Sequence, residues 1–149
     1  MELRIKIRPM EEGDLMRVGE IERLSFSFPW SVSFFSSELK KKGFAYYWVI
    51  ELNEVVVGYA GYWKIKNEAH LVNLAIHPHY RRKGLGKKFL AYILDDAQNK
   101  GLKMVTLEVR ESNRKAQRLY EKFGFKKVAI HPHYYHDTDE SAFVYLKKL

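Results

Sequence analysis

Apolar and polar residues alternate along this chain with two different periods, one typical of helices and one typical of strands. Apolar residues three and four positions apart predict helices over residues 11–25, 31–42, 84–100 and 113–123. Period-two or continuous apolar runs predict strands over residues 3–8, 44–52, 55–64, 69–76, 103–110, 125–130 and 141–147. The order β-α-α-β-β-β-α-β-α-β-β predicts an α/β fold with a mixed, mostly antiparallel central sheet and helices on both of its faces.

Turn-forming residues mark the ends of these segments. Gly43, Gly101 and Gly124 follow three of the helices, where a left-handed residue commonly ends a helix. Ser112 precedes the last helix and is expected to cap it. No linker or structural repeat separates the segments, so we expect one domain over residues 1–149.

The composition is that of a packed globular protein, with 46% hydrophobic and 15% aromatic residues. No apolar run approaches the roughly 20 residues that span a bilayer. The first seven residues alternate charged and apolar positions, unlike a signal peptide. The chain has no cysteine, which excludes disulfides and thiolate chemistry and suits a reducing compartment. We therefore expect a cytoplasmic protein that does not enter a membrane.

A formal net charge of +8 is spread over pairs of lysines and arginines at the ends of the predicted elements. Most such pairs are ordinary solvated surface. The cluster over residues 81–88 differs, because it adjoins a predicted anion site and would steer a polyphosphate towards it. A basic surface is compatible with work near ribosomal RNA, but the chain carries no nucleic-acid-binding motif, so we expect no specific nucleic-acid partner.

The predicted anion site is a basic, glycine-bearing turn between a strand and a helix. The strand ends in Leu74, Ala75 and Ile76, and the turn and first helical residues are Arg81, Arg82, Lys83, Gly84, Leu85, Gly86 and Lys87. The free N–H groups of a helix start bind anions, and glycines let a phosphate approach the backbone. A Walker loop is excluded because Lys88 stands where a hydroxyl is required, and a Rossmann turn because Phe89 replaces the third glycine.

The turn fits the pattern Arg/Gln-x-x-Gly-x-Gly/Ala and resembles the acyl-CoA pyrophosphate loop of the GCN5-related N-acetyltransferase (GNAT) superfamily. The order of elements is similar to that superfamily from end to end. Three segments resemble protein N-terminal (α-amino) acetyltransferases, including RimI-like enzymes: residues 107–113 with 119–125, Phe28-Pro29-Trp30-Ser31, and Tyr134-Tyr135 before an acidic stretch. The resemblance implies an acetyl-CoA-dependent enzyme that acetylates a protein N-terminus, on a ribosomal protein or a broader set of nascent chains.

The resemblance also implies roles for individual residues. Glu108 would be the general base, acting through water, and Tyr120 would donate a proton to the departing sulfur near the cofactor. Asn113 would reach the pantetheine arm, or would simply help to start the helix. The arm itself would pair with the backbone of the strand ending at Ile76. A bulge in that strand, for which Asn73 is a weak marker, would free an amide for the thioester oxygen. Without the resemblance, the residues favour reading Glu108 as a solvated strand carboxylate or one paired with Arg110 or Lys103. The alternative for Tyr120 is an aromatic packed between helix and sheet.

The chemistry of the acceptor amine is consistent with this assignment. An α-amine has a pKa of about 7.7–8.0, so roughly a tenth of it is neutral at pH 7, far more than of a lysine side chain. Acetylation of an α-amine therefore requires less proton removal by a general base. Because the chain has no thiol for a relay, we expect direct transfer in a ternary complex.

Aromatic residues on two predicted loops are the candidates for the peptide-binding wall. These are Phe28, Trp30, Tyr134 and Tyr135. An alternative for Phe28 and Trp30 is that they seal the junction between the first two helices. His131, His133 and His136 lack the spacing of metal ligands, so we expect no metal site.

Two other functions remain open from the sequence. One is a small-molecule N-acetyltransferase for polyamines or amino sugars, whose acceptor pocket would be acidic and would draw on Asp137, Asp139 or Glu140. The other is a non-catalytic CoA-binding sensor, which would not need Tyr120. The sequence does not indicate the oligomeric state or the preferred N-terminal residue.

Overall fold

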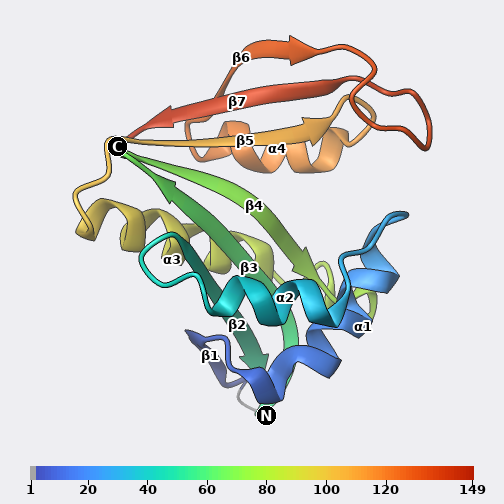
Figure 1. Cartoon of the computed structure of the whole chain (residues 1–149), viewed down its shortest axis with the longest axis vertical. Coiled ribbons are helices and arrows are strands. Elements are labelled where there is room, and N and C mark those ends of the chain that lie inside the picture. Colours follow the sequence, from blue (N-terminus) through green and yellow to red (C-terminus); the bar gives the residue numbers. More distant parts are fainter. Residues whose placement is uncertain (1–2) are drawn as a thin grey trace.

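The computed structural model describes residues 3–149, and the predicted order of elements is confirmed (Figure 1). The strands are β1 (Ile5–Pro9), β2 (Ala45–Leu52), β3 (Val55–Ile65), β4 (Glu68–Ile76), β5 (Met104–Arg110), β6 (Lys126–His131) and β7 (Ala142–Lys148). The α-helices are α1 (Leu15–Ser25), α2 (Val32–Leu39), α3 (Leu85–Asn99) and α4 (Arg114–Lys122). Two short 3₁₀ helices, η1 (Glu12–Asp14) and η2 (Pro78–Tyr80), precede α1 and α3.

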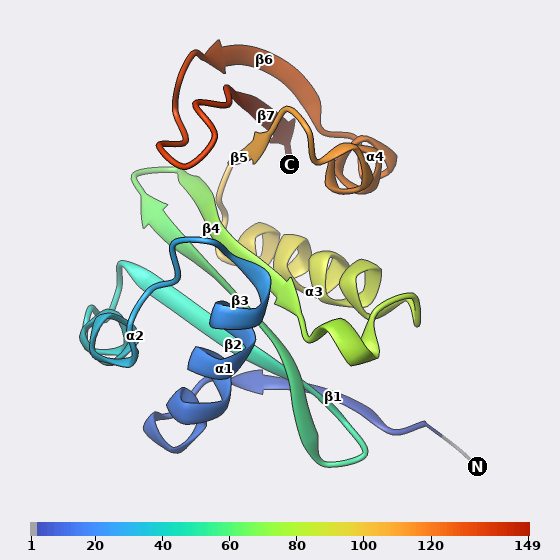
Figure 2. The same cartoon turned by 90° about the vertical axis from the view of Figure 1, so that its right-hand side faces the viewer.

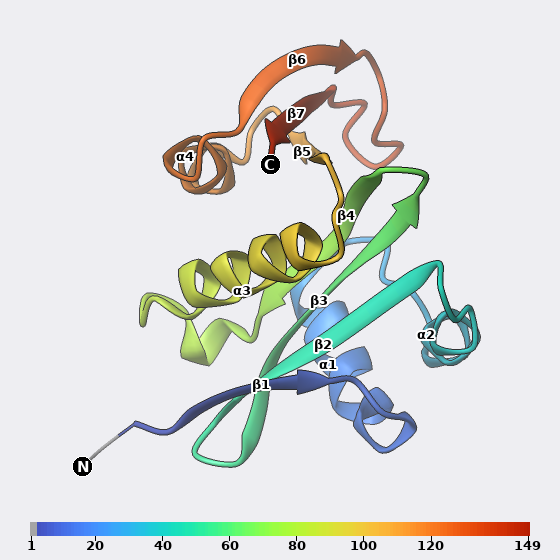
Figure 3. The same ribbon diagram turned by 90° about the vertical axis from the view of Figure 1, so that its left-hand side faces the viewer.

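Within residues 3–149 the strands form one seven-stranded sheet in the order β1-β2-β3-β4-β5-β7-β6. Neighbouring strands are antiparallel except for the parallel pair β4–β5. Helices α1 and α2 cover one face, and α3 and α4 cover the other (Figures 2 and 3). The mixed, mostly antiparallel sheet with helices on both faces is therefore confirmed.

The sheet forks between β4 and β5, and the fork positions the site. The two strands pair only over residues 68–71 and 104–107, beyond which they diverge (Figure 1). The pairing of β4 with β3 shifts at the same place. Tyr62 of β3 lies opposite Leu71, but the next residue of β3, Gly61, lies opposite Asn73, which leaves Val72 as an extra residue in β4. Such a bulge bends a strand and interrupts its pairing. The expected bulge is thus present, directly before Asn73.

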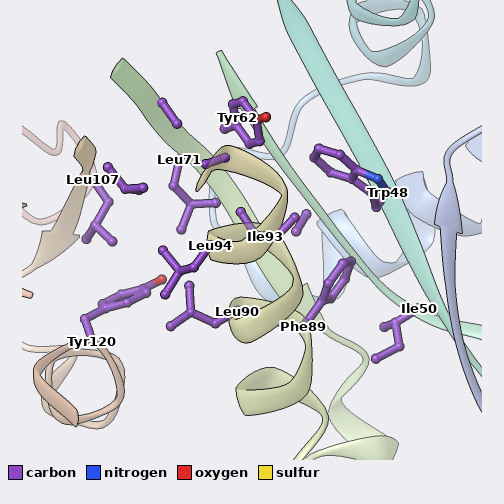
Figure 4. Close-up of a cluster of buried hydrophobic side chains, with 14 of the residues drawn as sticks. Trp48, Ile50, Tyr62, Leu71, Phe89, Leu90, Ile93, Leu94, Leu107 and Tyr120 are labelled. Atoms are coloured by element: carbon purple, nitrogen blue, oxygen red, sulfur yellow. The ribbon is translucent and has the colours of Figure 1, made fainter. Parts of the chain in front are cut away.

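A hydrophobic core lies on each face of the sheet. Under α3, the predicted apolar stripe of Leu85, Phe89 and Ile93 is buried against the sheet (Figure 4). On the opposite face, Val18 and Ile21 of α1 pack with aromatic residues of α2, β2 and β3. The two cores hold the sheet between two helical layers, so the fork is built on a rigid frame.

Three helix boundaries differ from the sequence prediction. Residues 12–14 are a 3₁₀ turn rather than the start of α1. Helix α2 ends at Leu39 and not at Lys42, because the Lys40 amide donates to the Ser37 carbonyl and tightens the last turn. The cap of α4 is Asn113 and not Ser112, since the Asn113 side chain accepts the Ala116 N–H at 3.1 Å. None of the helices in the described part of the chain combines the length and apolar character needed to span a bilayer.

Candidate active site

A cavity of about 650 Å³ opens at the fork, between the end of β4, the start of α3 and one side of α4. Its lining residues are Ser25, Phe26, Leu74, Ala75, Ile76, Tyr80, Arg81, Arg82, Gly84, Leu85, Gly86, Lys87, Asn113, Lys115, Ala116, Arg118, Leu119 and Lys122. The structure therefore brings together most of the residues predicted to hold the cofactor. Lys83 and Tyr120 do not line the cavity.

The turn before α3 has the geometry of an anion cradle. Gly84 precedes α3 with a φ of +75°, a left-handed conformation that favours glycine. At Gly86 a Cβ would meet only the Leu119 side chain, at 4.0 Å, so the backbone here is open to a ligand. The first amides of α3 and the positive end of its dipole therefore face a space that a phosphate can enter.

Basic side chains surround this cradle, but they are not equivalent. Arg81 is engaged within the protein, because its Nε donates to the Ile76 carbonyl at 2.8 Å and its guanidinium reaches the Ser25 hydroxyl at 3.3 Å. It ties the end of β4 to the end of α1. The remaining basic residues of the lining come from the α3 turn and from α4: Arg82, Lys87, Lys115, Arg118 and Lys122. The lysines and arginines of α4 add a source of positive potential that the loop motif does not reveal.

Glu108 stands at the point where the strands separate, one residue past the last β4–β5 pair. It is half-buried, and its neighbours Leu107 and Val109 are buried on the opposite face of the sheet, as alternation predicts. Its Oε1 lies 3.8 Å from Nε2 of His70. Its Oε2 is buried and makes no hydrogen bond of standard geometry among the described residues, although the Tyr134 hydroxyl is close enough that, after burial, the Glu108 carboxylate raises the pKa of Tyr134. A buried acceptor without a donor is costly, which marks Glu108 as chemically unusual.

His70 is a site residue that the sequence prediction missed. Its Nδ1 lies 3.0 Å from the Thr106 hydroxyl across the β4–β5 pair. Burial lowers the pKa of His70, although the charges of Glu108 and Glu68 oppose that shift, so the ring is neutral at pH 7. A lone histidine in a strand gives no local signal; only the pairing of β4 with β5 brings it to Glu108.

Tyr120 reaches from α4 towards Leu90 and Leu94 of α3 (Figure 4). It is 9% exposed, and its ring packs edge-on against Phe125 at 5.6 Å. Burial, with a smaller effect of Tyr135, raises the pKa of Tyr120 to about 12, so the phenol keeps its proton at neutral pH. Tyr120 is thus a packed aromatic residue whose hydroxyl keeps its proton at neutral pH.

The four predicted acceptor-wall residues divide into an exposed pair and a packed pair. Phe28 is 67% exposed and Tyr134 is 47% exposed. Trp30 is half-buried, with its ring 4.4 Å from that of Phe34, and so it seals the α1–α2 junction. Tyr135 is half-buried and meets Tyr134 edge-on at 5.0 Å. Each loop carries one residue of each pair, and the two loops, α1–α2 with Phe28 and Trp30 and β6–β7 with Tyr134 and Tyr135, face each other across the fork (Figures 1 and 2).

Arg110 organises the β6–β7 loop, a role that sequence reasoning did not identify. Its guanidinium donates to both oxygens of Asp137 at 2.9 Å and to Glu140 at 3.5 Å. Its Cζ lies 3.9 Å from the ring centroid of Tyr135. Glu140 also accepts the Ser112 N–H at 2.7 Å. The carboxylates of this loop therefore neutralise Arg110 and position Tyr135, instead of forming an open acidic pocket.

The histidines of the loop have other partners. His131 stacks on Tyr134 at 5.8 Å, and His133 pairs with Asp139 at 2.9 Å. No group of three histidine, aspartate or glutamate side chains is gathered in a metal-binding arrangement within residues 3–149.

Comparison with known proteins identifies the family. The model of the acetyltransferase (GNAT) family matches residues 15–125. The chain belongs to the GNAT family. A Bacillus subtilis protein, provisionally named a [ribosomal protein bS18]-alanine N-acetyltransferase, is 37% identical over 144 residues, covering 97% of this chain and 95% of the relative. The Escherichia coli K12 enzyme of that name is 34% identical over 133 residues, covering 89% and 88%.

A solved structure gives the same result for the fold. The crystal structure of the ribosomal-protein-S18-alanine N-acetyltransferase from Escherichia coli superposes with a TM-score of 0.90 at 31% identity, over 97% of this chain and 94% of that one. This GNAT protein is accordingly an N-acetyltransferase whose acetyl donor is acetyl-CoA. The predicted family, fold, enzyme class and cofactor are confirmed.

Proposed function

We propose that this GNAT enzyme acetylates the N-terminal α-amine of a protein, by direct transfer in a ternary complex, and that the acceptor is an N-terminal alanine of a ribosomal protein. The observation that carries the proposal is Glu108, a carboxylate at the fork with one buried oxygen unpaired and a neutral His70 beside the other. The names of the relatives support the choice of acceptor. Such a reaction belongs in the cytoplasm, where ribosomal proteins are made.

The residues around the cavity fit acetyl-CoA. The open backbone at Gly84 and Gly86 and the basic side chains of α3 and α4 suit its phosphates, and the end of β4 offers backbone groups to its pantetheine arm. When bound, acetyl-CoA supplies an activated acetyl thioester. Asn113 caps α4 through its Oδ1, and so it shapes the cavity wall that this arm would follow.

Glu108 and Tyr120 handle protons in this proposal. Glu108 accepts a proton from the acceptor amine, directly or through water, since its Oε2 is unpaired within the described structure. The neutral His70 ring lies 3.8 Å from Oε1, beyond hydrogen-bond distance, so it would pass the proton on only through a bridging water. Burial raises the pKa of Tyr120 to about 12, so its hydroxyl keeps its proton at neutral pH and would donate a hydrogen bond to the departing thiolate, which lowers the charge that develops on sulfur.

The acceptor end of the site lies between the α1–α2 and β6–β7 loops. Phe28 and Tyr134 offer exposed aromatic surface to a short extended peptide. A polyamine is a poorer fit, because Asp137 and Glu140 are bound to Arg110 and Asp139 is paired with His133. The loop therefore presents aromatic rings rather than free carboxylates to the acceptor.

An acetyl-transfer assay tests the proposal. Short peptides with free N-termini and varied first residues are compared with spermidine and with matched peptides whose only amine is a lysine side chain. We expect transfer to α-amines, with alanine-first ribosomal sequences preferred. Transfer to spermidine alone, or to no acceptor despite binding of acetyl-CoA, would overturn the proposal.

A further inference from the structure

Glu22 is a buried carboxylate that the proposed chemistry does not use. It lies in the last turns of α1 and is 2% exposed. No ion pair within residues 3–149 includes it. Burying a carboxylate without a cationic partner is expensive, and a leucine or methionine would fill the same space at lower cost. The presence of a carboxylate here calls for a specific role.

Three donors from three different segments converge on this carboxylate. Its Oε2 accepts the backbone N–H of Trp30, in the α1–α2 loop, at 2.9 Å. Its Oε1 accepts the Tyr59 hydroxyl from β3 and the Asn73 side-chain amide from β4 at 3.3 Å. One side chain thus joins the loop of the acceptor wall to the strand that bounds the cofactor cavity.

The attachment point on β4 is the bulge itself. Asn73 directly follows Val72, the extra residue of the bulge, and directly precedes Leu74, which lines the cavity. Asn73 and Ala75 project towards α1, and Glu108 projects towards the same face because Leu107 faces the opposite core. Glu22, the bulge and the proposed base therefore occupy one side of the sheet.

We propose that Glu22 is a positioning residue that couples the acceptor loop to the β4 bulge, so that the acceptor peptide and the acetyl donor meet in a fixed relative geometry. The proposal rests on the proposed function for its substrate. The hydrogen bond from Trp30 to Glu22 fixes the end of the α1–α2 loop, and it thereby limits the position of Phe28, two residues earlier. Small errors in the placement of two reactants reduce their rate of reaction strongly.

A carboxylate suits this task better than a neutral side chain. In its ionised form, which predominates above a pKa that burial raises to about 7, the carboxylate has only acceptor positions, enough for all three donors at once. Glutamine offers one oxygen, so at least one of the three donors would face its NH₂ group and would have to turn away or reverse its role. The variant Glu22→Gln therefore loosens the junction while keeping the volume of the side chain.

Glu38 provides a matched control. It is a fully buried carboxylate on the neighbouring helix α2, and it accepts hydrogen bonds from Tyr47 at 2.7 Å and Trp63 at 2.6 Å; unlike Glu22 it also has a cationic partner, Lys41, at 2.6 Å. None of these partners donates to Glu22 or lines the cavity, although Tyr47 packs against Gly61, which lies opposite Asn73. The variant Glu38→Gln should thus share any general cost of changing a buried carboxylate, but not the effect on the site.

The first test is steady-state kinetics on a peptide that the wild type acetylates. For Glu22→Gln we expect kcat/KM for the peptide to fall about tenfold, with the affinity for acetyl-CoA unchanged. Tyr59→Phe, which removes one donor and keeps the ring, should show a smaller loss of the same kind. Glu38→Gln should leave the peptide kinetics at the wild-type level. Equal losses in Glu22→Gln and Glu38→Gln would overturn the proposal.

The second test needs no acceptor and separates this inference from the proposed function. Amide hydrogen exchange is followed by NMR at Trp30 and at residues 72–74. If Glu22 couples the two segments, Glu22→Gln should accelerate exchange in both by about tenfold or more, and Glu38→Gln should not. Acceleration at Trp30 alone would show that loop and bulge are independent and would contradict the coupling, whether or not the wild type acetylates peptides.

Discussion

The donor and acceptor sides of the fork are built in different ways. The donor side, which would bind acetyl-CoA, is formed mainly by backbone. One continuous segment from the end of β4 to the first turn of α3 makes it, with open space at Gly86. The acceptor side, which would bind the peptide, is held by side-chain contacts. Arg110 binds Asp137 of the β6–β7 loop, and Glu22 accepts the Trp30 N–H of the α1–α2 loop. The contrast suggests that donor binding depends on local geometry, whereas acceptor placement depends on long-range contacts.

The largest expected effect tests the donor side. Gly86→Asp places a carboxylate where the cradle would receive a phosphate, and at about 4 Å such charges repel by about 4 kcal/mol at a surface-like dielectric. We expect acetyl-CoA binding to weaken about a thousandfold in calorimetry. Gly13→Asp is the control of equal charge, because a Cβ at Gly13 meets nothing within 4 Å and one at Gly86 meets only Leu119 at 4.0 Å, and because Gly13 lies outside the cavity. Retained binding in Gly86→Asp would refute the assignment of the loop.

The next effect concerns the base at the junction of the two sides. Glu108→Gln should lower kcat about a hundredfold, because a general base is lost, while the affinity for acetyl-CoA stays at the wild-type value. The measurement is kcat between pH 6 and 9, beside a binding titration. A rate unchanged across that range would remove Glu108 as the base.

Tyr120→Phe separates packing from proton donation. The ring remains in the core, where it packs against Phe125, so thermal stability should change little. We expect kcat to fall by about a factor of 30, since general acid catalysis is lost. A wild-type rate from this variant would leave Tyr120 with a packing role only.

The acceptor side should also show a pH signature in stability. Burial raises the pKa of Glu22 to about 7 from an ordinary 4.5, against the opposing effect of the Trp30 N–H. The folded state thus holds this proton more tightly than the unfolded state. The associated stability is fully present below pH 4.5 and is lost as the pH rises through about 7.

This loss should amount to about 3 kcal/mol in the free energy of unfolding. Tyr47, which also faces Glu22, titrates far above this range because burial raises its pKa. Denaturant melts at pH 4.5, 6 and 7.5 should therefore show the decline in the wild type and in Glu38→Gln, but not in Glu22→Gln. The same slope in all three proteins would show that another group is responsible.

The smallest expected effect is a change in KM for one of the two substrates and not for the other. Arg110→Lys removes the two-pronged contact with Asp137, which lysine cannot reproduce, and loosens the loop that carries Tyr134 and Tyr135. We expect the KM for the peptide to rise about fivefold and the KM for acetyl-CoA to stay constant. Lys87→Gln, in the cavity lining, should do the reverse. If both variants shifted the same constant, the separation of the two sides would be wrong.

The same contrast explains what could be predicted from the sequence. The cofactor turn was predictable because a strand, a glycine-bearing turn and a helix follow one another, and local sequence determines their geometry. Burial of the α3 stripe followed from its period. Lys115, Arg118 and Lys122 were missed at the cavity because nothing local places α4 beside α3.

The acceptor side could be predicted only in part. Phe28 and Tyr134 were identified through resemblance, but the packing of Trp30 depends on Phe34 and on α2. His70, Glu22 and Arg110 each act through partners at least 27 residues away: Thr106, Asn73 and Asp137. Such pairings arise from strand register and helix docking, which no pattern along the chain encodes.

The most direct test of the proposed function is a competition within one molecule. A peptide with an N-terminal alanine and one internal lysine is incubated with the enzyme and acetyl-CoA, and the acetylated position is mapped by fragmentation mass spectrometry. We predict acetylation of the alanine α-amine, with the lysine unmodified and the product absent for Glu108→Gln at short times. Acetylation of the lysine in preference to the α-amine would contradict the proposal.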